Sequence, residues 1–139
     1  MIISKVREYM MSCPQLADKK ININCLGTKA QSFSIDSVDT DPVIKKYCDG
    51  SALKQAVFNL SVRDRYDENL GGSLFVTELL EKVEDWIWTQ NVLKNLPVFG
   101  SKNAISRSIE VTKSGHLYDT SMSNGRWQME FRVVYRQSA

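Results

Sequence analysis

Few of the residues that build catalytic and metal sites occur in this sequence. Its 139 residues include one histidine, His116, and three cysteines, Cys13, Cys25 and Cys48. The cysteines lie 12 and 23 positions apart, so neither a CxxC pair nor a zinc-binding spacing is present. We therefore expect three reduced thiols that behave as small hydrophobic residues in a reducing compartment.

The motifs of common cofactor and metal enzymes are also missing. The sequence has no GxxxxGK[ST] loop, no GxGxxG after a strand and no HExxH. A hydrolytic triad needs a base within hydrogen-bonding reach of a nucleophile, and His116 falls in residues 114–125, which we expect to be a polar loop. Glu81, Glu84 and Asp85 are interpreted as a solvated helix face rather than a metal cluster. The sequence thus predicts a protein that is not an enzyme and uses no cofactor or metal.

The sequence has neither a large excess of charge nor a long hydrophobic run. Eighteen Lys and Arg residues face sixteen Asp and Glu, a formal charge of +2, which is far from the basic excess of dedicated nucleic-acid binders. The apolar start is interrupted by Lys5, Arg7 and Glu8, so we expect neither a signal peptide nor a membrane span, and the protein stays in the cytosol. Its 42% hydrophobic and 24% charged residues are typical of one globular domain, residues 1–139.

Hydrophobic periodicity predicts two helices. Residues 1–12 place apolar side chains at spacings of three and four, and Pro14 is a plausible stop. The second helix, residues 73–91, follows Gly71-Gly72 and ends before Pro97. Its apolar stripe consists of Val76, Leu79, Leu80, Val83, Trp86 and Ile87.

Alternation of apolar and polar residues predicts five to six strands. Two short strands, at residues 20–25 and 33–35, are expected to form a hairpin, and two more flank Asp49-Gly50, a dipeptide that favours a type I′ turn. The last strand has one apolar and one polar face. The later strands are expected at residues 43–48, 53–63, 105–112 and 127–136. Because such a sheet is apolar on one side, we predict a two-layer α+β domain whose mainly antiparallel sheet carries both helices on one face.

A mixed-charge run and one tryptophan are the candidate interaction residues. Arg63, Asp64, Arg65 and Tyr66 follow a predicted strand, and Arg and Tyr are enriched where proteins dock, although such a run also suits a solvated loop. Trp88 lies off the apolar stripe of the second helix, so it either caps the edge of the core or contacts a partner. A modest basic surface, which serves either a polyanion or plain solubility, is made of Arg107, Lys113, Arg126 and Arg132.

Four blocks, in order, resemble a family of small phage proteins, the minor capsid or tail terminator (tail-completion) proteins. They are DPVIKKYCDGS at residues 41–51 with the strand up to residue 65, WIWTQN…LP at residues 86–97, residues 104–119 ending in GHLYD, and residues 126–135. The resemblance covers roughly residues 20–136. It departs at His116, where the family commonly has a tyrosine, so no role is carried over to that position.

The resemblance implies an architectural role. Family members form a ring, usually a hexamer, that caps the last ring of tail-tube protein, ends its polymerisation and offers a surface to the head. The implied partners are other copies of this chain and tail-tube protein, with sheath protein and the head-tail connector as further candidates, DNA only in transit through the pore, and no membrane. The implied place is the head-proximal end of the virion tail, after synthesis in the host cytoplasm.

Under this interpretation, the polar sheet face and the loops at residues 63–71 and 114–125 are the expected subunit or tube contacts, together with Trp88. Two alternatives stay open. One is a head-completion or connector adaptor that binds on the portal side. The other is a nucleic-acid-binding accessory module, which would show steeply salt-dependent DNA binding.

Overall fold

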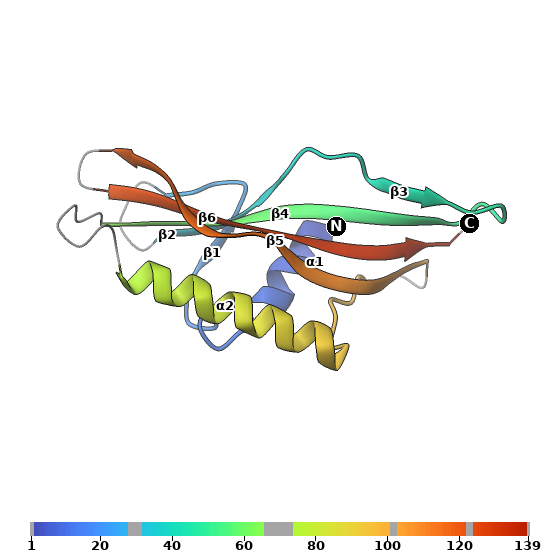
Figure 1. Ribbon diagram of the computed structural model, residues 1–139, viewed down its shortest axis with the longest axis horizontal. Helices are drawn as coiled ribbons and strands as arrows, with labels where there is room; N and C mark the ends of the chain where they lie inside the picture. Colours follow the sequence, from blue (N-terminus) through green and yellow to red (C-terminus); the bar gives the residue numbers. More distant parts are fainter. Residues whose placement is uncertain (1, 28–31, 66–73, 101–102, 122–123, 139) are drawn as a thin grey trace.

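The computed structural model describes residues 2–27, 32–65, 74–100, 103–121 and 124–138. The two helices are α1 (Ile2–Met10) and α2 (Leu74–Leu93). The six strands are β1 (Ile21–Ile23), β2 (Ser32–Ser37), β3 (Val43–Lys46), β4 (Ala52–Arg65), β5 (Ala104–Ser121) and β6 (Asn124–Gln137). They form one sheet in the order β1-β2-β4-β6-β5, with β3 also paired to β4 (Figure 1).

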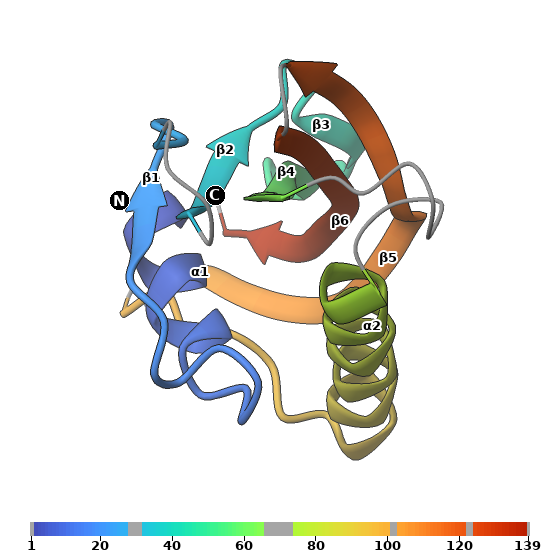
Figure 2. The same ribbon diagram turned by 90° about the vertical axis from the view of Figure 1, so that its left-hand side faces the viewer.

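The predicted two-layer α+β architecture is confirmed. The sheet is strongly curved, and both helices lie on the same side of it (Figure 2). Aligned apolar stripes explain this arrangement, because each helix buries one face against the apolar side of the sheet, α2 next to β5 and α1 next to β1 and β2. The core includes Ile3, Val6, Met10, Phe33, Leu60, Val83, Ile87, Met129 and Phe131.

The last strand has the burial pattern that its alternation predicted, with one addition. Trp127, Phe131 and Tyr135 are buried with the other apolar-face residues of β6, but Gln128 and Val134 on the opposite face are buried too. The curvature of the sheet accounts for this, because a curved sheet partly encloses its second face.

The hairpin expected for the first two strands is wrong. β1 and β2 are parallel, with Ile21 opposite Phe33 and Ile23 opposite Ile35. A period of two reports which side chains share a face and carries no information on strand direction. β1 is tied instead to the first helix, where Arg7 Nε donates to the carbonyl oxygen of Ile21 at 2.5 Å.

The hairpin between β3 and β4 is confirmed, but its turn is not type I′. Gly50 has a φ of 89°, whereas Asp49 is not in the positive-φ region. Gly50 N donates to Tyr47 O at 3.2 Å, and Tyr47 N donates to Ser51 O at 2.9 Å. This is a three-residue loop with glycine in the left-handed position, and Asp49 adds a carboxylate that accepts from Ser51 N at 3.0 Å.

The polar loop expected at residues 114–125 is also wrong. β5 continues to Ser121 and β6 begins at Asn124, so His116 lies within a strand. The pairing of β5 with β6 shifts register at four places, which follow Ser106, Val111, Lys113 and Leu117. Each shift interrupts the alternation of side chains, which is why a strand of 18 residues reads in the sequence as a shorter strand followed by a loop.

Candidate interaction surfaces

The mixed-charge run lies within β4 rather than in a loop after it. Arg63 Nε donates to Gly27 O at 2.9 Å, and Asp64 is 8% exposed, with its Oδ1 accepting from Arg65 N at 2.8 Å. Arg65 is exposed at the end of the strand. Tyr66, the fourth residue of the run, lies outside the described residues. Arg63 and Asp64 therefore make contacts inside the subunit, which leaves Arg65 as the accessible member.

Side-chain contacts occupy much of the polar sheet face at the same end. Asp36 accepts hydrogen bonds from Ser34 Oγ at 2.5 Å and from Ser61 Oγ at 2.8 Å, and both serines are fully buried. Arg126 Nη2 lies 3.7 Å from Asp36 Oδ2, and its guanidinium lies over the ring of Tyr118. This part of the polar face is held together from within.

The basic surface expected along the last strands is partly neutralised. Arg132 forms an ion pair with Glu110 and donates to Gln55 Oε1 at 3.2 Å. Arg126 is paired with Asp36 as described above, whereas Arg107 and Lys113 are exposed. Two of the four side chains are thus committed to carboxylates of the same chain, which weakens this surface as a site for a polyanion.

Trp88 belongs to the outer face of α2 and does not cap the core. It is 72% exposed, whereas Trp86, two residues earlier, is half-buried with its ring 5.2 Å from that of Tyr9. Trp88 lies about four turns from the start of α2. The end of β4 lies near that start, so the length of the helix separates Trp88 from the residues at the end of β4 (Figure 1). The structure therefore does not gather the predicted contact residues into one patch.

More exposed apolar side chains lie in the last turn of α2, in the segment that follows it and at the start of β5. They are Val92 at 64%, Leu93 at 68%, Val98 at 79% and Ile105 at 59%. Single exposed apolar residues are ordinary, whereas neighbouring ones on the same face mark an interaction surface. Sequence reasoning found Trp88 alone, although Val92 lies one turn further along the same face.

A groove of about 370 Å³ runs between α2 and β5 beside Trp88. Three carboxylates contribute to it, and two of them already have partners: Glu84 accepts from Gly115 N at 2.6 Å, and Glu110 pairs with Arg132. The groove is lined by Glu84, Asp85, Ile87, Trp88, Asn91, Ile109, Glu110, Val111 and Ser114. It is a partly apolar hollow with an acidic margin.

The hairpin of β3 and β4 carries a second exposed surface, which sequence reasoning missed. Ile44 is 44% and Tyr47 is 37% exposed. Two cations lie near the Tyr47 ring, with Lys45 Nζ at 5.5 Å and the Arg136 guanidinium at 5.4 Å from its centroid. The exposure follows from the topology, because among the described strands β3 pairs with β4 alone and its other edge is open.

Burial shifts the pKa of two groups at the core, Tyr9 and Cys13. Burial raises the pKa of Tyr9 to about 12, with a smaller contribution from Cys13. Burial also raises the pKa of the Cys13 thiol. On the hairpin, hydrogen bonds from Ser51 and then the nearby Arg136 lower the pKa of Asp49.

Within the described part of the chain, the structure contains no cluster of three or more His, Cys, Asp or Glu side chains able to hold a metal ion. His116 is exposed, and its Nδ1 lies 2.9 Å from the carbonyl oxygen of Ser114. Among the described helices, none has the length and hydrophobicity needed to cross a membrane.

The sequence matches no family model and no curated protein.

Proposed function

We propose that the protein is a ring-forming tail terminator, a structural component of a phage or a phage-tail-like particle. In this role it caps the tail tube, ends tube polymerisation and provides a joining surface for the head. The resemblance of residues 20–136 to tail terminators motivates the proposal. The observation that carries it is the pair of exposed apolar side chains, Trp88 and Val92, one turn apart on the outer face of α2, because neighbouring exposed apolar groups mark a contact surface.

The fold suits a ring whose two sides differ. The two exposed surfaces, on α2 and on the hairpin, have different residues, so contacts between copies would be heterologous and would close into a ring at the right rotation. The two flat sides of such a ring are not equivalent. If the exposed side of the ring does not match the surface of a tube subunit, no further tube subunit binds and growth stops. This requires no catalysis.

Tube growth tests the proposal directly. Purified tail-tube protein of the same particle is polymerised with and without this chain, and tube lengths are measured by electron microscopy. We expect shorter tubes, each with density at one end, and a ring of about 95 kDa for six copies of the 15.8 kDa chain. Tubes of unchanged length with bare ends would contradict the proposal, and binding to portal protein instead would favour a head-completion adaptor.

A further inference from the structure

Charge is segregated between the two exposed surfaces, although the whole chain is nearly neutral. α2 carries four acidic residues, Glu78, Glu81, Glu84 and Asp85, against one lysine, Lys82. The hairpin carries Lys45, Lys46 and Lys54, and Arg136 adds a fourth cation that also pairs with Asp49 at 3.7 Å. One surface is therefore acidic and the other basic, at a formal net charge of only +2 for the chain.

The outer face of α2 combines these carboxylates with apolar groups in one line. Spacings of four, three and four residues place Glu81, Asp85, Trp88 and Val92 above one another on the helix, and all four are exposed. We refer to these four residues as the helix stripe. The indole of Trp88 thus has carboxylates on the preceding turns and an aliphatic side chain on the next.

The hairpin has the complementary composition. Ile44, Lys45, Lys46 and Tyr47 are exposed and consecutive, and we refer to them as the hairpin tip. Alternation along the strand places Lys45 and Tyr47 on the same side, in agreement with the lysine lying over the ring. An aromatic ring beside cations is suited to a surface that offers an aromatic ring beside carboxylates.

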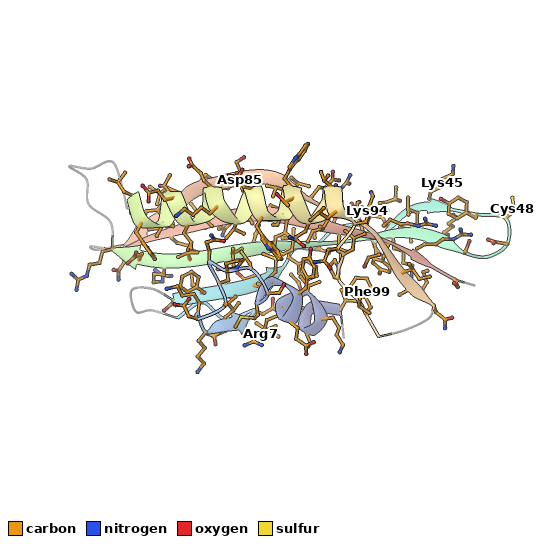
Figure 3. The ribbon with its side chains drawn as sticks, turned by 90° about the horizontal axis from the view of Figure 1, so that it is seen from below. Arg7, Lys45, Cys48, Asp85, Lys94 and Phe99 are labelled. Carbon is orange, nitrogen blue, oxygen red and sulfur yellow. The ribbon has the colours of Figure 1, made fainter. Side chains whose placement is uncertain are left out.

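The two surfaces lie apart within one subunit. The hairpin extends past the C-terminal end of α2, with Asp85 on the helix and Lys45 and Cys48 at the far end of the hairpin (Figures 1 and 3). The helix stripe of a chain is thus available to the hairpin tip of another copy. Such a contact joins two different patches, so it is heterologous and propagates from copy to copy until a ring closes.

We propose that the partner of the helix stripe is a second copy of this chain, whose hairpin tip docks on it. Tyr47 packs near Trp88 and into the adjacent groove, while Lys45, on the same side of the strand as Tyr47, faces Glu81 and Asp85. This deepens the proposed function and rests on it, since it names the two surfaces through which neighbouring ring subunits meet. Opposite charges set the register of the contact, and the aromatic pair provides its buried centre.

Cross-linking between copies tests the contact, because Cys48 is exposed next to the hairpin tip. The test protein carries C25S, to remove the other exposed thiol, and T89C beside the helix stripe. Isotopically light and heavy protein are mixed and treated with a short bismaleimide. We expect mixed-label cross-links between Cys48 and position 89, and a ladder of products up to the ring. The matched control places the cysteine on α1 with E8C, at a site whose side chain is 66% exposed.

A charge exchange tests the assignment of the charged partners. The variants D85K and K45E are each expected to reduce the mixed-label yield about tenfold, and their combination to restore it to within about threefold of the parent. Circular dichroism checks that each variant is folded. Equal yields for T89C and E8C, or a combined variant as low as either one alone, would overturn the proposed contact.

The outcomes separate this contact from the proposed function. If tubes are capped but the cross-link is no stronger than the control, the ring uses other surfaces and only the contact is wrong. If copies cross-link as expected but tubes grow to full length, the contact is correct and tail termination is wrong.

Discussion

At the scale of single residues, two tryptophans two positions apart have opposite surroundings. Trp86 packs against Tyr9, whereas Trp88 is 72% exposed. In the sequence, Trp86 belongs to the apolar stripe of α2 and Trp88 does not. This pattern left open whether Trp88 caps the edge of the core or contacts a partner. Its exposure was not predictable, because it depends on where β5 ends its contact with the helix.

This difference gives a prediction. We expect Trp88→Ala to change the free energy of unfolding by less than about 0.5 kcal/mol, because the side chain leaves no cavity. Trp86→Ala should lower it by about 1–3 kcal/mol, since a half-buried ring and its aromatic contact are lost. Urea denaturation followed by circular dichroism measures both values. A loss for Trp88→Ala as large as that for Trp86→Ala would show that the exposed indole supports the core.

The phenol of Tyr9 predicts a loss of stability at high pH. Its pKa rises from 10.0 to about 12 on folding, so the folded state holds this proton more tightly than the unfolded state. The stabilisation is fully present below pH 10 and is lost as the pH rises from 10 through 12. Cys13, whose pKa burial also raises, contributes in the same direction.

Denaturation midpoints measured from about pH 8 to about pH 11 should therefore fall in the parent protein and fall less in Tyr9→Phe. The conservative change keeps the ring that packs against Trp86 and removes the hydroxyl that donates to Asn95 O at 2.7 Å. Tyr118→Phe, which removes a 60% exposed phenol, is the control. Identical slopes in the parent and in Tyr9→Phe would mean that this phenol does not resist ionisation.

At the scale of elements, both helices were predictable because an apolar stripe identifies a helix and its buried face together. The direction of β1 was not predictable, since parallel and antiparallel strands share the same alternation. The second half of β5 was missed because its register shifts interrupt the alternation at the positions where a strand would have been recognised.

The contact between α2 and β5 depends on the absence of a side chain at Gly115. A Cβ atom there would lie 2.7 Å from Leu80 Cδ1 and 2.8 Å from Leu80 Cβ, closer than atoms approach without movement. We expect Gly115→Ala to lower the free energy of unfolding by about 1–3 kcal/mol through overpacking. Ser114→Ala, one exposed position away, should change it by less than about 0.5 kcal/mol. Equal thermal melting of the two variants would show that the helix shifts freely on the strand.

At the scale of the whole molecule, the sequence indicated a protein with balanced charge, but it did not show how the charges divide. Glu81 and Asp85 are exposed, as expected for a solvated helix face, whereas Glu84 is half-buried and accepts a hydrogen bond from Gly115 N. No contact was predicted for the lysines of β3. Only the folded chain shows that the lysines occupy a hairpin extending beyond the helix (Figure 3). The interaction surfaces therefore depend on topology, which local patterns do not determine.

The division of charge predicts that association between copies weakens with salt. Raising sodium chloride from about 0.05 M to about 0.5 M shortens the range of attraction between exposed charges to a few ångströms, so the ring should form at higher protein concentration. Sedimentation velocity at several salt concentrations measures this shift. The D85K variant is the matched comparison and should lose most of the dependence. Association that strengthens with salt would instead indicate contacts dominated by the apolar residues.

The irregular pairing of β5 has a consequence for how copies avoid the wrong kind of association. β5 is an edge of the sheet, and a long, flat edge offers unpaired backbone groups to any other chain, which leads to fibrils. Its bulges bend that backbone out of alignment, and the opposite edge, β1, has only three residues. The two edge strands β5 and β1 are thus poor templates for the addition of a strand from another chain.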